Sequence, residues 1–165
     1  MKNKSEILSY LLILTLIVFH YVTISIYSAT PASQSSQDSM VIVDKVIDVI
    51  EFVSGNDGVS LDAEAKGFVH HIIRKLAHII LFFIYGFLNM MFSYLVCNRN
   101  YLKAVSPAWF MGACGAAFDE CLQLFVEGRA GMVSDVFVDM IGVSGACFCF
   151  SMMIYFILNE ERVFL

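Results

Sequence analysis

The chain has 165 residues, of which 59% are hydrophobic and 15% are charged, and its formal net charge at pH 7 is −5. Average soluble domains contain about 45–50% apolar and about 25% charged residues, so the composition argues against an ordinary soluble domain. The sequence has no basic stretch of the kind that binds nucleic acid, which excludes a nucleic-acid partner.

Four long apolar runs dominate the chain. Since about 20 helical residues cross the hydrocarbon core of a bilayer, each run is long enough to span a membrane. The sequence therefore predicts an all-α protein with a single membrane domain over residues 1–165. The expected transmembrane helices occupy about residues 7–27, 76–97, 104–126 and 136–158.

The first run follows Lys2 and Lys4, a pattern that also begins secretory signal peptides. The run is longer than the apolar region of a signal peptide, which has about 7–15 residues. The SATPAS segment that follows has no clear A-x-A cleavage motif. We therefore expect a retained helix, with cleavage as the alternative.

Residues 28–75 are expected to form an outer loop between the first and second spans. The loop begins with ATPASQSSQDS, whose composition is typical of turns and irregular chain. Met40–Val53 then places its three acids on one helical face and aliphatic residues on the other. This pattern predicts an amphipathic helix on the membrane surface or against the bundle. GNDGVS ends that helix, and another is expected to begin near Ala63 and lead into the second span.

Basic residues near the spans give the orientation, because cytoplasmic loops are enriched in Lys and Arg. The residues that decide it are Lys2, Lys4, Arg99 and Lys103. We expect the N-terminus and the loop after the second span to be cytoplasmic, and the C-terminus follows by helix parity. The acidic segment 28–75 would then face the outside. Arg74 and Lys75 oppose this orientation unless nearby carboxylates neutralise them.

In this orientation, polar residues that interrupt three of the spans fall at the outer ends of those spans. Asp119 and Gln123 share a helical face, as do Asp135 and Asp139, because residues four apart are neighbours on a helix. Carboxylates within a membrane should face the bundle interior or a hydrated pocket. The candidate catalytic residues are His78, Asp119, Glu120 and Asp135. The candidate substrate-binding residues are Arg74, Lys75, Gln123, Arg129 and Asp139.

Two segments resemble the VanZ-like membrane proteins, namely RKLAH at Arg74–His78 and DECLQLFVEGRAGMVSDVFVDMIG at Asp119–Gly142. SQSSQDS at Ser33–Ser39 resembles the outer loop of that family. Leu81 and Phe82 stand where the family often has Glu and Tyr, so no role of those side chains carries over. The resemblance implies a Gram-positive bacterial cell membrane and an accessory role in resistance to the glycopeptide antibiotic teicoplanin. It also implies membrane lipids, or a lipid-linked cell-wall precursor, as partners.

One hypothesis is an enzyme, a hydrolase or transferase, that acts on a lipid-linked headgroup. The three basic candidates would hold a phosphate, Arg by two parallel hydrogen bonds, and His78 with Asp119 or Glu120 would transfer protons. A divalent metal among His78 and the carboxylates is a further possibility, although the sequence has no HExxH or similar spacing. The sequence therefore does not identify a cofactor.

The second hypothesis is a non-catalytic helper or binding protein in which the charged cluster is a salt-bridge network. Ser134 or Asp135 would then cap the start of the fourth span. Gly142 and Gly145 would allow close helix packing. The sequence does not indicate the oligomeric state.

Overall fold

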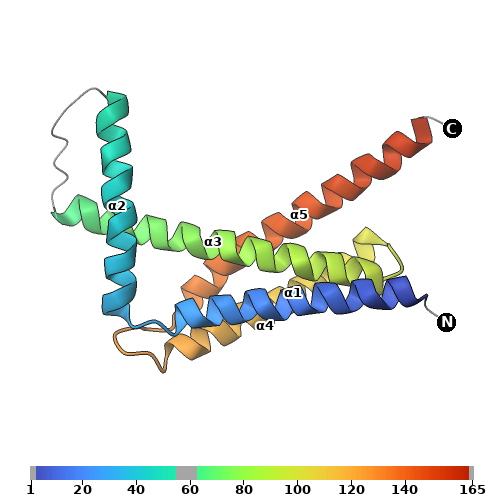
Figure 1. Ribbon diagram of the computed structural model, residues 1–165, viewed down its shortest axis with the longest axis horizontal. Helices are drawn as coiled ribbons and strands as arrows, with labels where there is room; N and C mark the ends of the chain where they lie inside the picture. The colour runs from blue at the N-terminus through green and yellow to red at the C-terminus, as the bar shows by residue number, and fades with distance from the viewer. Residues whose placement is uncertain (1–2, 55–62, 164–165) are drawn as a thin grey trace.

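The computed structural model describes residues 3–54 and 63–163. Within these ranges its elements are five helices joined by turns, with no strand, which confirms the all-α prediction (Figure 1). The described helices are α1 (Lys4–Ser28), α2 (Ala32–Ser54), α3 (Ala63–Val96), α4 (Tyr101–Gln123) and α5 (Val133–Val163).

Three segments of these helices are long and apolar enough to cross a membrane, namely Lys4–Ser28, Glu64–Val96 and Val133–Asn159. They include the expected first, second and fourth spans. Helix α4 has 23 residues, which is long enough to cross, but it is less apolar and is not among them. Its C-terminal part carries buried Asp119, Glu120 and Gln123.

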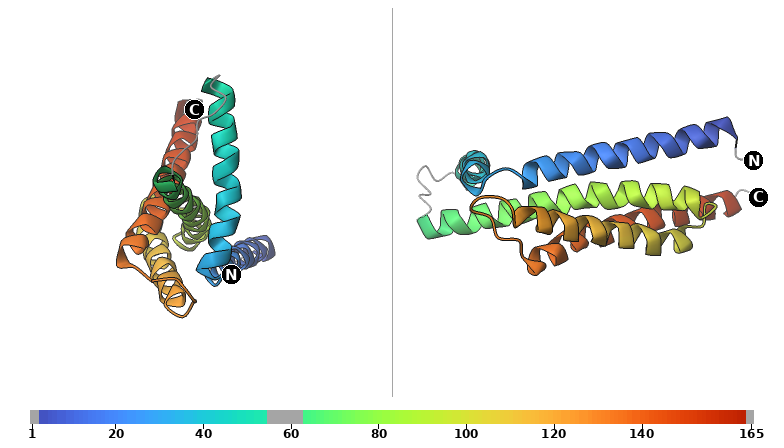
Figure 2. Two further views of the ribbon diagram at one scale, coloured as in Figure 1. Left: turned by 90° about the vertical axis from the view of Figure 1, so that its left-hand side faces the viewer. Right: turned by 90° about the horizontal axis from the view of Figure 1, so that it is seen from below.

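Helix α3 is the centre of the bundle, because it packs against each of the other four helices. Phe82 and Met90 of α3 are fully buried, as is Val143 of α5. Helix α2 runs across the direction of α1, α3 and α4 and crosses α3 near the N-terminal end of α3, whereas α5 is oblique to the bundle (Figures 1 and 2). Helix α1 begins, and α5 ends, at the end of the bundle opposite to α2 (Figure 1).

Two glycines bring the backbones of α3 and α5 into contact. A Cβ atom on Gly142 would collide with the backbone oxygen of Ile79, and one on Gly86 would lie 2.8 Å from the Cα of Val143. Gly145 is different, since an added Cβ would meet the Phe83 ring at an ordinary 3.6 Å. The expected role in close packing therefore holds for Gly142 and not for Gly145.

Within residues 28–75, the structure has a helix over residues 40–53 and another that begins at Ala63, as the sequence predicts. The irregular chain predicted for ATPASQSSQDS was wrong, because α2 covers most of that stretch. Helix α2 begins at Ala32 rather than at Met40, directly after Pro31, whose fixed φ suits a helix start. Helix α2 buries Val43 and Ile47. Helix α3 already begins at Ala63, so the chain before the expected second span belongs to the same helix. The GNDGVS break lies outside the described residues.

Candidate functional site

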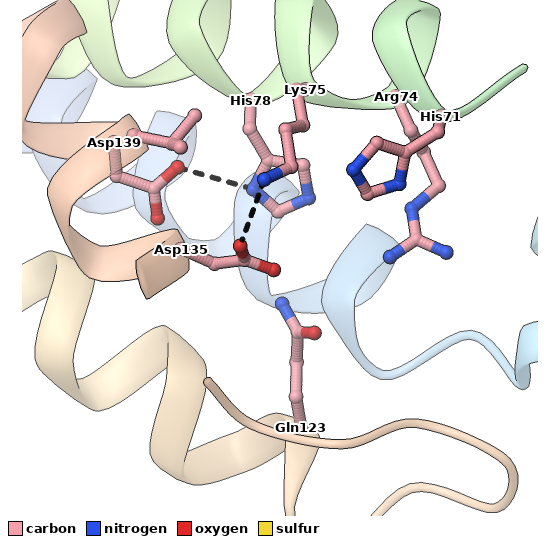
Figure 3. Close-up of a pocket in the computed structure, with 8 residues that line it drawn as sticks. His71, Arg74, Lys75, His78, Gln123, Asp135 and Asp139 are labelled. Carbon is pink, nitrogen blue, oxygen red and sulfur yellow. Dashed lines mark ion pairs between the residues drawn. The ribbon is translucent and has the colours of Figure 1, made fainter. Parts of the chain in front are cut away.

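Most of the candidate residues meet where the C-terminal end of α4 and the N-terminal end of α5 face α3. Figure 3 shows side chains of α3 above, with Asp135 and Asp139 of α5 and Gln123 of α4 pointing toward them. The end of α1 completes this region through Ser28. The sequence predicted convergence from three helices, and the structure adds the first helix to them.

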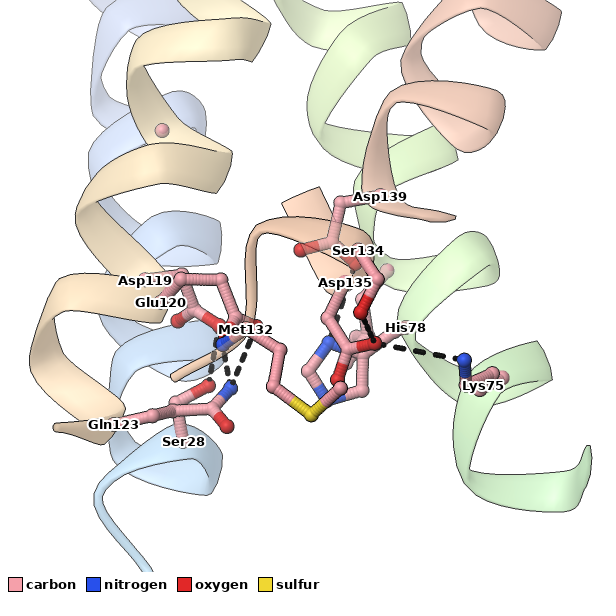
Figure 4. A network of polar contacts seen from close by, with 12 residues as sticks. Ser28, Lys75, His78, Asp119, Glu120, Gln123, Met132, Ser134, Asp135 and Asp139 are labelled. Carbon is pink, nitrogen blue, oxygen red and sulfur yellow. Dashed lines mark hydrogen bonds and ion pairs between the residues drawn. The ribbon is translucent and has the colours of Figure 1, made fainter. Parts of the chain in front are cut away.

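Two ion pairs connect α3 to α5. The Nδ1 atom of His78 lies 3.3 Å from Oδ1 of Asp139, and the Nζ atom of Lys75 lies 3.5 Å from Oδ1 of Asp135 (Figures 3 and 4). The side chain of Asp139 is 1% exposed, whereas those of Lys75 and Asp135 are 36% and 23% exposed. The first pair is therefore the more shielded from water and should be the stronger of the two.

Asp119 is held by two donors that come from different helices. Its Oδ2 atom accepts a hydrogen bond from the hydroxyl of Ser28 at 2.8 Å and another from Nε2 of Gln123 at 3.2 Å (Figure 4). Its Oδ1 atom has no hydrogen-bond partner among the described residues. Asp119 and Asp139 are both fully buried. Two buried carboxylates thus lie in the cluster, and a buried charge is costly unless it is paired.

Glu120 joins the end of α4 to the start of α5. Its Oε2 atom accepts the backbone N–H of Met132 at 2.8 Å, and its Oε1 atom accepts Nε2 of Gln123 at 3.3 Å. The first N–H groups of a helix have no partner within the helix, so a carboxylate there is favourable. Since α5 begins at Val133, Ser134 and Asp135 lie inside its first turn and are not its cap. Asp135 is instead an acid in the first turn of α5, where the positive end of the helix favours it.

Arg129 makes its hydrogen bonds with backbone oxygens, and it forms no ion pair with a carboxylate among the described residues. Its Nε atom donates to the backbone oxygen of Thr30 at 2.8 Å, and its Nη2 atom donates to that of Tyr27 at 3.2 Å. The last carbonyls of a helix lack intrahelical partners, so a cation there satisfies the end of α1. Burial, and then the nearby Arg74 guanidinium, lower the pKa of Arg129, although arginine keeps its charge in proteins.

Arg74, which the sequence predicts to bind a phosphate, lines a small pocket together with His71 (Figure 3). The pocket has a volume of about 10 Å³, room for roughly one water molecule. Beside it is a larger cavity of about 460 Å³. Arg74 and His78 line both cavities. The larger cavity is lined by residues of α1, α2, α3 and the α4–α5 turn.

Sequence reasoning missed two members of the polar network. Ser28 is the last residue of α1 and binds a side chain 91 positions away, so no local pattern marks it. The contribution of Met132 is its backbone N–H, which every residue other than proline carries. Both become visible only when the ends of the helices are brought together.

The family model described as VanZ/LLP1 matches residues 7–158, which include the site and nearly all of the candidate spans. The chain belongs to the VanZ/LLP1 family. This membership confirms the resemblance carried by RKLAH and by Asp119–Gly142. No curated protein and no solved structure matched the chain. The roles of the VanZ/LLP1 site residues therefore stay predictions.

Proposed function

We propose that this VanZ/LLP1 protein binds the anionic headgroup of an envelope lipid or lipid-linked cell-wall precursor. The observation that carries the proposal is the position of Arg74 and His78, which line both the small polar pocket and the cavity of about 460 Å³. Ligand sites commonly combine an apolar cavity with a few polar groups at one end. An amphipathic lipid matches this arrangement, because it has an apolar tail and a polar headgroup at one end.

The wall of the larger cavity suits an alkyl or prenyl chain. Its aliphatic part comes from the first three helices and consists of Ile24, Ile42, Ile73, Ala77, Ile80 and Leu81. Ser28, Thr30, Ser35 and Ser39 supply hydroxyl groups near the ends of α1 and α2. A lipid with its tail along the aliphatic wall would bring its headgroup to Arg74.

Arg74 is the best candidate for the headgroup contact. Lys75 is already paired with Asp135, and Arg129 is bound to the end of α1. Within residues 3–54 and 63–163, the guanidinium of Arg74 makes no hydrogen bond or ion pair. A guanidinium can hold a phosphate by two parallel hydrogen bonds. Lys75 and Arg129 would therefore support the site without contacting the phosphate.

The proposal includes a multi-pass location in a bacterial cell membrane, with both termini cytoplasmic and the site at the outer face. Helix α4 would cross beside α3 and α5, with which it packs, as the fourth span. The basic residues Lys4, Arg99 and Lys103 lie near the start of α1 and the α3–α4 turn, away from the site. This separation agrees with the enrichment of Lys and Arg on the cytoplasmic side.

An outer-face lipid site would also connect the protein to glycopeptide susceptibility, because teicoplanin acts on cell-wall precursors outside the membrane. The His78 and Asp139 pair has the arrangement of a base oriented by a carboxylate. Proton transfer in hydrolysis or group transfer at the headgroup would use that pair. The alternative is a non-catalytic helper in which the polar contacts only hold α3, α4 and α5 together.

Binding can be measured with the purified full-length protein in detergent, using a long-chain prenyl phosphate and the matching prenol as probes. We expect the phosphate to bind more tightly, and Arg74→Ala to weaken it by about ten- to a hundredfold, since hydrogen bonds to charged groups contribute about 1.5–3 kcal/mol. Arg74→Lys should retain part of the affinity. Arg99→Ala, at the other end of the bundle, is the matched control.

Equal affinity for the phosphate and the prenol, or an unchanged affinity in Arg74→Ala, would contradict the proposal. Teicoplanin susceptibility of the host, with wild type and the same variants at equal membrane abundance, is the cellular measurement. Loss of folded protein in both Arg74→Ala and Arg74→Lys would favour the alternative in which the polar contacts only hold the helices together.

A further inference from the structure

Three potential metal ligands from three helices converge where the C-terminal end of α4 and the N-terminal end of α5 face α3. One ligand atom each from His78 of α3, Asp119 of α4 and Asp139 of α5 lie within 4.8 Å of one another. Asp119 and Asp139 are fully buried, and His78 is partly exposed. We propose that these three side chains form a binding site for a divalent cation.

The free carboxylate oxygens are the first reason for this proposal. Oδ1 of Asp119 and both oxygens of Asp139 are buried and have no hydrogen-bond partner in the described part of the chain. Asp139 has only the ion pair with His78 at 3.3 Å. Buried polar groups in folded proteins nearly always have partners, so unpartnered carboxylate oxygens on two residues beside His78 favour a bound cation.

The second reason is that Asp119 is oriented through one oxygen only. Ser28 and Gln123 both donate to its Oδ2 atom, at 2.8 and 3.2 Å, which leaves Oδ1 free on the same rigid carboxylate. Metal-binding carboxylates are typically held in this way by a surrounding layer of hydrogen bonds. The contact to Ser28 also explains why the end of α1 belongs to the cluster.

The local charges are the third reason. Of the nearby basic side chains, Lys75 is paired with Asp135, and Arg129 is bound to backbone oxygens. Neither forms an ion pair with Asp119 or Asp139 within the described ranges. A divalent ion would compensate both buried carboxylates at once. The competing solution is a proton held by one of the two carboxyl groups.

Two carboxylates and an imidazole are ligands for Zn²⁺ or Mn²⁺ rather than for a soft metal. Bonds of about 2.0–2.2 Å allow two ligands of one ion to be about 4.4 Å apart at most, so a small rotation of the side chains would complete the site. Three protein ligands leave coordination positions for water or an anionic group. The metal site shares His78 with the proposed lipid site but needs no bound lipid. An ion bound there would replace the direct contact between His78 and Asp139.

The test is the metal content of the full-length protein purified in detergent, stripped with EDTA, and then titrated with Zn²⁺ or Mn²⁺. We expect about one ion per chain and a higher melting temperature with metal. Asp119→Asn and Asp139→Asn keep the side-chain shape and should each weaken binding at least tenfold. Asp135→Asn is the matched control, since Asp135 pairs with Lys75 outside the three ligands, and it should keep the stoichiometry.

Two results would overturn the proposal. The first is no saturable binding of either metal to the folded wild type. The second is equal binding by wild type and the two Asn variants, which would mean an adventitious ion elsewhere. If a proton neutralises the carboxylates instead, neither metal nor EDTA should change the melting temperature. Prenyl phosphate binding measured in EDTA separates this outcome from failure of the proposed function.

Discussion

The carboxylate of Glu120, near the end of α4, accepts the backbone N–H of Met132, just before α5, at 2.8 Å. One side chain thereby fixes the start of α5 relative to the end of α4. Asp135 and Asp139 lie in the first two turns of α5, so their positions against α3 depend on this contact. The residues of the polar site lie at the ends of helices, and the hydrogen bond from the Met132 N–H to Glu120 fixes two of those ends relative to each other.

Replacing Glu120 should show how much this contact stabilises the bundle. Glu120→Ala leaves the Met132 N–H without its partner, and we expect a loss of about 1–3 kcal/mol, the usual cost of an unsatisfied polar group. The measurement is unfolding in detergent by denaturant or heat. Glu127→Ala is the control, because Glu127 is exposed and its change should stay within about 0.5 kcal/mol. If Glu120→Ala and Glu127→Ala lose the same amount of stability, the capping role of Glu120 is contradicted.

Gly142 and Gly145 provide a matched pair of substitutions on α5. Gly142→Ala places a methyl group against the backbone of Ile79, so α3 and α5 must separate. We expect a loss of about 1–3 kcal/mol, as for an overpacked core. Gly145→Ala meets only the Phe83 ring at 3.6 Å and should be tolerated. Thermal unfolding of both variants in the same detergent tests this, and equal stability would mean that the helices do not approach closely at Gly142.

The two ion pairs between α3 and α5 should differ in strength. Double-mutant cycles with His78→Ala and Asp139→Ala, and separately with Lys75→Ala and Asp135→Ala, measure the coupling within each pair. We expect about 0.2–1 kcal/mol for the partly exposed Lys75 pair. The pair of His78 with buried Asp139 should couple more strongly. A larger coupling energy for the Lys75 pair would contradict the difference in burial.

Arg129 is expected to act on the end of α1 rather than on a carboxylate. Arg129→Ala removes the donors to Thr30 and Tyr27, and we expect a loss of about 1–3 kcal/mol. Arg129→Lys should recover only part of this, because one ammonium group cannot reproduce the guanidinium geometry. Proteolysis in the α1–α2 turn should also become faster in Arg129→Ala. If Arg129→Ala leaves both stability and cleavage unchanged, the contact does not hold α1.

The amino-acid sequence alone predicted an all-helical membrane protein and most of the polar residues that the structure brings together. Long apolar runs predict membrane helices for energetic reasons, since such stretches are stable in a bilayer and ionised groups within them are not. The same energetic cost marked His78, Asp119 and Asp139 as unusual, and the spacing of four residues predicted which side chains share a face. These features are local, so they can be read from neighbouring residues.

The tertiary structure decided which of these groups meet and what each one contacts. Ser28 reaches Asp119, and Arg129 reaches the end of α1, across 91 and 99 positions of the chain. The helical start of α2 was also hidden, because Ser residues at positions 33, 35, 36 and 39 favour caps and turns as readily as helix. Hydrogen bonds between distant helix ends depend on packing, and packing is set by contacts such as Gly142 against Ile79 that no local pattern specifies.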